Sequence, residues 1–232
     1  RLLLSIILIS SFSFSQETDY QGFMNFYYNN DSGKIILDID KLDTEFMYIN
    51  SLSRGVGNND LGLDRGQLGN SRIVYFTKRG NKILLIQPNL RYVSNSSNYL
   101  ENKAVEEAFA RSVLFGFDII EISNDTYKID LTPFLINDAH GVSQRLKSSN
   151  AGSYSLNKSM SAIDLERTKA FPKNIEFDVI LTFTGSPAGN LVRSVTPTAS
   201  NLTVNQHHSF VELPDNNYIC LLYTSDAADD AL

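Results

Sequence analysis

The sequence contains no tryptophan, only one cysteine and only three histidines. Because Cys220 is alone, the chain cannot form an internal disulfide bond, and metal sites built from paired cysteines are excluded. The common zinc hydrolases carry a His-Glu-x-x-His motif, in which two imidazoles bind the metal and the glutamate activates water. None of His140, His207 and His208 is followed by glutamate. We therefore expect no catalytic residue, no zinc site and no other cofactor in this chain itself.

Clusters of positive charge are also missing. The chain has 20 lysines and arginines against 26 aspartates and glutamates, its net charge is −6, and the two signs are interspersed. A nucleic-acid site needs clustered basic side chains that replace counterions on phosphates, so we expect no nucleic-acid partner. The nucleophile motif Gly-x-Ser-x-Gly is absent as well. The aromatic bulk comes instead from 14 phenylalanines and 11 tyrosines, so one substantial core is expected.

The first 15 residues have the composition of an export signal. Residues 2–14 are apolar and uncharged, follow Arg1, and are too few to span a bilayer as a helix. We predict a signal peptide over residues 1–15 with cleavage before Gln16. This implies export to the periplasm, the outer surface or the medium, without a stable membrane anchor. The alternative is a buried core helix.

The other end has a different character. Residues 219–232 resemble translated sequencing-adapter read-through, which occurs at the ends of metagenomic fragments. We expect this tail to be non-native, and a short natural tail is the alternative. Residues 16–218 then form one β-rich domain that is incomplete at its C-terminus.

Short alternating runs separated by turn residues predict strands in hairpin order. Residues 98–116 have apolar side chains at helical spacing and predict one long helix that ends at Gly116. Thr132 and Pro133 suit the start of a short helix over residues 134–138, and residues 141–174 predict an extended stretch with one or two short strands. The fold class is therefore α+β, mainly antiparallel β, with about nine or ten strands. The clearest strands are residues 22–28, 34–39, 45–52, 72–78, 82–87, 117–122, 126–131, 174–184 and 202–213.

Residues 54–71 contain five glycines and three leucines. Apolar side chains gain nothing in water, so we expect an ordered loop that Leu61, Leu63 and Leu68 anchor while the glycines turn the backbone. Asp64 and Arg65 either pair to pin this loop or present Arg65 to a partner or a peptide carboxylate. Gln67 belongs to the same group of candidate interface or loop-pinning residues.

Two shorter motifs complete the candidate residues. Residues 138–141 suit the C-terminal cap of a helix, with Gly141 in a left-handed conformation. On a strand, His208 shares one face with Phe210 and Glu212, and His207 faces the other way. His208 and Glu212 would be about 13 Å apart, which is too far for one metal ion without a sharp bend. We expect His207 and His208 to be structural or interface residues, with metal binding as the alternative.

Five segments in the same order resemble a family of large secreted bacterial zinc-dependent metalloproteases. In that family a domain of unknown function, DUF5117, precedes a zincin catalytic domain. The resemblance extends over nearly all of residues 20–218. The segments are residues 62–69 (GLDRGQLG), 84–89 (LLIQPN), 138–141 (DAHG), 167–174 (RTKAFPKN) and 207–209 (HHS).

The resemblance implies a non-catalytic N-terminal module of an exported metalloprotease. Zinc and its ligands are expected in the downstream catalytic domain, which would be the partner on which this module packs and whose substrate cleft it helps to shape. A peptide substrate is a further expected partner. A stand-alone secreted β domain that binds a glycan or a peptide is the alternative.

Overall fold

The computed structural model describes residues 17–94 and 96–215. The expected signal peptide, the tail from residue 219 and Cys220 lie outside the described residues. Within them, 12 strands and three α-helices confirm a mainly antiparallel β fold. The strands are β1 (Glu17–Tyr20), β2 (Phe26–Asn29), β3 (Lys34–Ile39), β4 (Phe46–Arg54), β5 (Leu68–Arg79), β6 (Lys82–Gln87), β7 (Ser112–Ser123), β8 (Thr126–Asp130), β9 (Gly152–Leu156), β10 (Ala162–Phe171), β11 (Asn174–Pro187) and β12 (Asn201–Glu212). The helices are α1 (Tyr99–Ala108), α2 (Thr132–Leu135) and α3 (Val142–Ser148), with 3₁₀ turns η1 (Asn59–Leu61) and η2 (Lys158–Met160).

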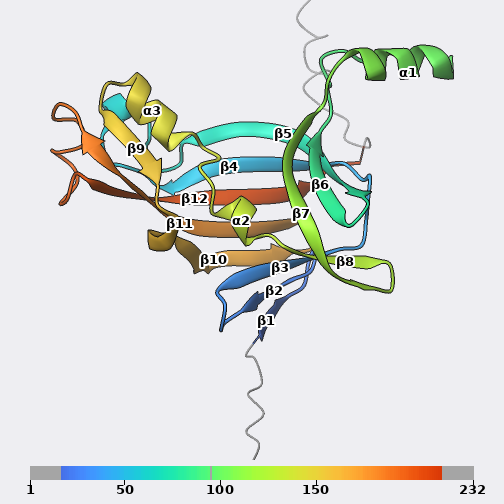
Figure 1. Ribbon diagram of the computed structural model, residues 1–232, viewed down its shortest axis with the longest axis horizontal. Helices are drawn as coiled ribbons and strands as arrows, with labels where there is room; N and C mark the ends of the chain where they lie inside the picture. Colours follow the sequence, from blue (N-terminus) through green and yellow to red (C-terminus); the bar gives the residue numbers. More distant parts are fainter. Residues whose placement is uncertain (1–16, 95, 216–232) are drawn as a thin grey trace, which may run out of the picture.

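The strands form one sheet in the order β1-β2-β3-β8-β7-β6-β5-β4-β12-β11-β10, and β9 pairs with β11. The sheet curls over itself, so that β1, β2 and β3 lie beside β10 (Figure 1). The backbone N–H of Phe23 donates to the carbonyl of Phe171 at 2.8 Å, which ties the β1–β2 connection to the end of β10. Long strand pairings between distant segments therefore hold the fold together without any disulfide bond.

The core fills the space that the curled sheet encloses. Phe210 of β12 has its ring centroid 5.3 Å from Phe46, 5.5 Å from Tyr48 and 6.0 Å from Phe177. Helix α2 adds Phe134, whose ring lies 6.2 Å from that of Phe210. Since burial of one large apolar side chain contributes about 1.5–3 kcal/mol, this aromatic cluster is a major stabilising element.

The expected helix over residues 98–116 is wrong in its second half. Helix α1 begins after Asn98, whose side chain accepts a hydrogen bond from the N–H of Leu100, and it ends at Ala108. The chain from Ser112 onward is strand β7, because pairing with β6 supplies its backbone hydrogen bonds. Gly116 does not end a helix; it lies opposite Leu84, and an added Cβ would meet that side chain at 3.3 Å.

The segment after β8 also differs from expectation. Helix α2 covers Thr132–Leu135, and Thr132 does not cap it. The Thr132 hydroxyl accepts from the N–H of Ile35 at 2.9 Å instead, which fastens the helix to β3. The sequence pattern predicted no helix over residues 141–174, yet α3 lies there.

Helix α3 depends on a cap from the preceding turn. The Asp138 carboxylate accepts from the backbone N–H groups of Gly141, Val142 and Ser143 at 3.0, 2.7 and 2.9 Å. Gly141 is left-handed as expected, with φ 81°, but it precedes α3 and does not end a helix. Gly141 is therefore the N-cap residue of α3, and the Asp138 side chain caps the start of this helix from three residues earlier. The C-terminal cap predicted for residues 138–141 is wrong.

We expect Asp138→Ala to lower the free energy of unfolding by about 1–2 kcal/mol, because three helix N–H groups lose their acceptor. Urea denaturation of residues 17–215 measures the change. Asp31→Ala, at an exposed turn position, is the control and should change stability by less than about 0.5 kcal/mol. Equal effects of the two substitutions would contradict the capping role.

Candidate functional site

The glycine-rich loop over residues 54–71 is ordered and bonded to β4. The N–H of Val56 donates to Leu63 O at 2.8 Å, and the N–H of Gly66 donates to Leu52 O at 2.7 Å. Leu61 and Leu63 are buried as expected, at 0% and 1% exposure, whereas Leu68 is 70% exposed and belongs to β5. The expectation for Leu68 was wrong, because pairing with β4 turns its side chain outward.

Glycine is required at two points of this loop. An added Cβ at Gly55 would collide with the backbone carbonyl of Leu63, so the two arms of the loop approach more closely than any side chain permits. Gly62 is left-handed, with φ 60°, and an added Cβ there would collide with the guanidinium of Arg145. The loop is thus shaped against itself and against α3.

Asp64 and Arg65 do not pin the loop by pairing. The ion pairs within residues 17–94 and 96–215 do not include one between these two side chains. They face different hollows, because Asp64 lines a pocket of about 470 Å³ and Arg65 lines another of about 270 Å³. Backbone hydrogen bonds such as Leu52 N–H to Gln67 O, at 3.0 Å, hold the loop instead.

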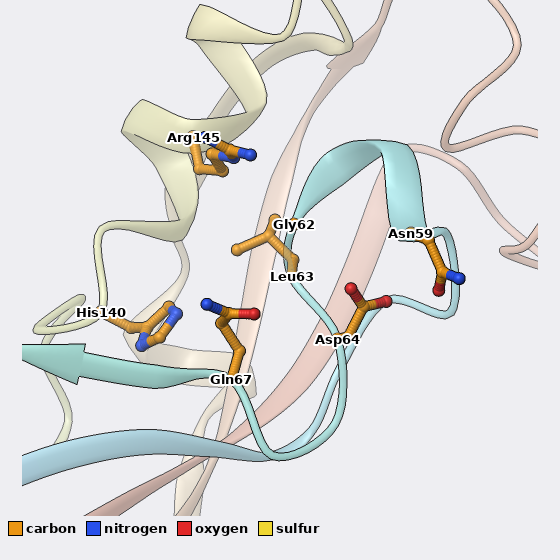
Figure 2. A pocket seen from close by; sticks show the side chains of 7 residues that line it. All are labelled: Asn59, Gly62, Leu63, Asp64, Gln67, His140 and Arg145. Carbon is orange, nitrogen blue, oxygen red and sulfur yellow. The ribbon is translucent and has the colours of Figure 1, made fainter.

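The larger pocket, here called the loop pocket, joins the glycine loop to α3. Figure 2 shows Asp64 and Gln67 on the loop side, with Arg145 and His140 on the other wall. Asn59, Gly62 and Leu63 complete the lining. The side chain of Arg145 is held by its Nε, which donates to Leu61 O at 2.6 Å.

The smaller hollow lies beside His207. Arg65, Gly66 and Arg167 line it together with His207 and the segment from Ser51 to Ser53 of β4. The structure thus brings Arg65 and His207 to one hollow, Asp64 and Gln67 to the loop pocket, and His208 to neither.

His207 sits between two carboxylates on one face of the sheet. Its Nε2 lies 2.7 Å from Glu176 Oε2 and its Nδ1 lies 3.2 Å from Asp178 Oδ2. The strand register places Asp178 directly opposite His207 and Glu176 directly opposite Ser209, whose hydroxyl donates to Glu176. Asn205 adds a hydrogen bond of 2.9 Å to Asp178.

Two opposing effects set the pKa of His207. Burial acts to lower the pKa, but the hydrogen bonds and charges of Asp178 and Glu176 outweigh it and raise the pKa to about 9. Burial acts to raise the pKa of both carboxyl groups, yet their hydrogen bonds, with His207 foremost, hold them below their usual values. At neutral pH the imidazole is therefore a cation with both nitrogens engaged, and it cannot act as a general base.

His208 lies on the opposite face of β12 from His207, and its surroundings favour the neutral ring instead of the cation. Its side chain is fully buried, Nδ1 lies 2.9 Å from the Tyr48 hydroxyl, and Nε2 lies 2.8 Å from Gln206 Nε2. Burial lowers the pKa of His208 to about 3, so the ring is neutral. The strand geometry expected for the two histidines is confirmed, with their side chains on opposite faces of β12.

The described residues hold no group of three or more histidine, cysteine or acidic side chains arranged to bind a metal ion. Among the helices that the structure describes, none has the length and apolar character needed to cross a membrane.

Residues 66–219 match the family model described as "Domain of unknown function (DUF5117)". The chain belongs to the DUF5117 family. Comparison with curated proteins and with solved structures gave no match. The matched segment of the DUF5117 domain begins inside the glycine loop and includes Gln67, His207 and His208, but not Asp64 or Arg65. Strand β4 precedes the matched segment and yet is an interior strand of the sheet, where it pairs with both β5 and β12.

Sequence reasoning did not identify the partners of His207 or the role of Arg145 in this DUF5117 domain. Glu176 and Asp178 alternate on a strand that is otherwise rich in apolar residues. Because buried carboxylates require a partner of opposite charge, that pattern predicts a cation beside them. Arg145 carries no such signal, because only the fold brings α3 to the glycine loop.

Proposed function

We propose that this DUF5117 domain is a non-catalytic, exported interaction module that packs against a domain further along the same polypeptide. The resemblance to secreted zinc-dependent metalloproteases suggests a zincin catalytic domain as the occupant, with zinc and the reacting groups in that domain. The observation that carries the proposal is a group of exposed apolar side chains around α1, which residues 17–94 and 96–215 leave uncovered.

The helix α1 stands off the sheet (Figure 1), and none of its residues is buried. Tyr99 is 71% exposed and Leu100 is 69% exposed. A groove of about 910 Å³ runs beside the helix, and the stacked rings of Tyr92 and Phe109, 4.0 Å apart, line it. Polar and charged side chains, among them Lys103 and Glu106, line the same groove. Exposed apolar side chains that gather beside one helix within a polar rim are typical of an interaction site.

The path of the chain supports an occupant from the same polypeptide. Strand β12 ends at Glu212, which pairs with Phe46 at the start of β4. Glu45, which precedes Phe46 in the chain, lines the α1 groove. Tyr75 also lines the groove, and it follows Val74, the residue of β5 that pairs with Phe46. Strand β12 therefore ends one strand away from a residue that lines the groove. A domain linked close to this point would have a high effective concentration at the groove.

The test compares the full polypeptide with residues 17–215 alone. We expect hydrogen exchange of the α1 amides to slow at least about tenfold in the full polypeptide, because about 1.4 kcal/mol of docking energy changes an equilibrium tenfold. The double substitution Leu90→Asp and Tyr99→Asp should abolish this protection and reduce cleavage of a casein substrate. Leu68→Asp is the control, since Leu68 is equally exposed but lies outside the groove.

Two outcomes would contradict the proposal. Equal exchange of α1 in both forms would show that the groove has no intramolecular occupant, and concentration-dependent dimers of residues 17–215 would identify a second copy as the occupant. Arg65→Ala examines the glycine loop as the competing interface. If Arg65→Ala lowers cleavage while the groove substitutions do not, the docking surface is the loop and not α1.

The loop pocket favours a second candidate function, a stand-alone domain that binds a peptide or a glycan. Its polar lining and separate charges could serve a ligand with no catalytic domain present. A substitution in the loop pocket that abolishes ligand binding without changing the hydrogen exchange of the α1 amides would distinguish this function from docking.

A further inference from the structure

The loop pocket contains a positioned cation whose terminal nitrogens are not used by the fold. Arg145 donates from Nε to Leu61 O at 2.6 Å, and Gly62 leaves room for its guanidinium. Within residues 17–94 and 96–215, neither Nη group has a hydrogen bond or an ion pair. A guanidinium held at Nε with both Nη groups available suits bidentate binding of a carboxylate.

The same pocket contains an anion that is equally unpaired. The backbone carbonyl of Asp64 accepts from the N–H of Gln67 at 3.1 Å, which fixes the turn. The Asp64 carboxylate forms no hydrogen bond and no ion pair in the part of the chain that the structure describes, with Arg145 or any other residue. The fold thus keeps one cation and one anion apart on the walls of one pocket (Figure 2).

The remaining lining can donate and accept hydrogen bonds. Asn59 and Gln67 contribute amide groups, and burial lowers the pKa of His140, so that its ring is neutral at pH 7. His140 Nδ1 has no hydrogen-bond partner among the described residues. A neutral glycan would leave both charges of the pocket unmatched, whereas a ligand with two opposite charges matches both.

We propose that the loop pocket binds a short peptide with free termini. Its α-carboxylate pairs with the Arg145 guanidinium, its ammonium group faces Asp64, and its amide contacts Gln67. The volume of about 470 Å³ lies in the range of small-ligand sites. This site is independent of docking at the α1 groove, because the glycine loop follows the far end of β4 from Phe46.

Calorimetric titration of the full chain with L-alanyl-L-alanine tests the site. Saturable binding is expected, and C-terminal amidation and N-terminal acetylation of the dipeptide should each weaken it at least about tenfold, because each removes one charge pair. Arg145→Gln should weaken binding of the free dipeptide in the same way and lose most of the discrimination against the amide. Arg65→Gln is the matched control, since that exposed guanidinium lies outside the pocket, and it should leave the affinity unchanged.

Binding of the dipeptide, its amide and its acetylated form to the unaltered chain tests the proposal even if Arg145→Gln does not fold. No heat of binding at millimolar dipeptide, or equal affinity for the dipeptide and its amide, would overturn the proposal. Equal weakening by Arg65→Gln and Arg145→Gln would show non-specific charge attraction and would also overturn it. The groove substitutions Leu90→Asp and Tyr99→Asp should leave binding intact, so failure of the docking proposal is separable from failure of this one.

Discussion

His207→Gln is expected to lower the free energy of unfolding by about 3 kcal/mol at pH 6.5. The raised pKa of His207, about 9 against an ordinary 6.5, means that the folded state binds its proton more tightly than the unfolded state. A difference of about 2.5 pKa units corresponds to about 3 kcal/mol. Glutamine keeps hydrogen-bonding groups but leaves Glu176 and Asp178 buried without a cation, and such uncompensated charge destabilises strongly.

The pH dependence of this stabilisation has a definite sign. Because the folded-state pKa is raised, the contribution is complete below pH 6.5 and is lost as pH rises to about 9. Urea denaturation of residues 17–215 between pH 6 and pH 10 should show falling stability in the unaltered domain and a flatter profile in His207→Gln. His140→Gln is the control, since burial lowers the pKa of that ring and the ion pairs of the described residues do not include it. A parallel decline in His207→Gln would show that another group causes the alkaline loss.

The second large effect is acid destabilisation through His208. Burial holds its pKa at about 3, so the unfolded chain binds this proton more readily than the folded chain. Stability from the neutral ring is complete above pH 6.5 and is lost as pH falls towards 3, by roughly 3–5 kcal/mol in total. Protonation would place a charge among Tyr48, Phe134 and Gln206 in the core.

His208→Phe separates this effect from titration of the carboxyl groups. The substitution should cost about 1–3 kcal/mol at pH 7, because the Tyr48 hydroxyl and the Gln206 amide lose a partner. It should also flatten the stability profile between pH 6.5 and pH 5. The lowered pKa values of Glu176 and Asp178 delay their protonation to a more acidic range. An unchanged slope above pH 5 in His208→Phe would rule out His208 as the cause.

Together the two histidines give the domain a stability maximum near pH 6.5. They are consecutive in sequence, and strand alternation sends one to a carboxylate pair and the other to the aromatic core. A pocket or groove on this domain is therefore best measured near pH 6.5 to 7, where neither histidine weakens the fold.

The sequence alone determined the strands whose alternation and turns are local properties. Residues 34–39 and 82–87 were predicted with the bounds that β3 and β6 have, and the hairpin around residues 123–125 is confirmed. The DUF5117 resemblance was also readable from linear motifs, and the family match confirms it. Burial of Leu61 and Leu63 followed from composition, because leucines among glycines need an apolar contact.

The rest depended on partners that are distant in sequence. The apolar pattern of residues 112–116 is compatible with a helix or a strand, and pairing with β6 decided for a strand. Capping by Asp138 stabilises α3, a helix of seven residues that the sequence pattern did not predict. Likewise, Asp64 could be read as the partner of Arg65 because the two are adjacent. In the tertiary structure the two side chains line different pockets. Arg145, which lies 81 positions beyond Asp64 in the sequence, lines the same pocket as Asp64. Strand periodicity determines which face a side chain occupies, but only the folded chain determines what lies across from it.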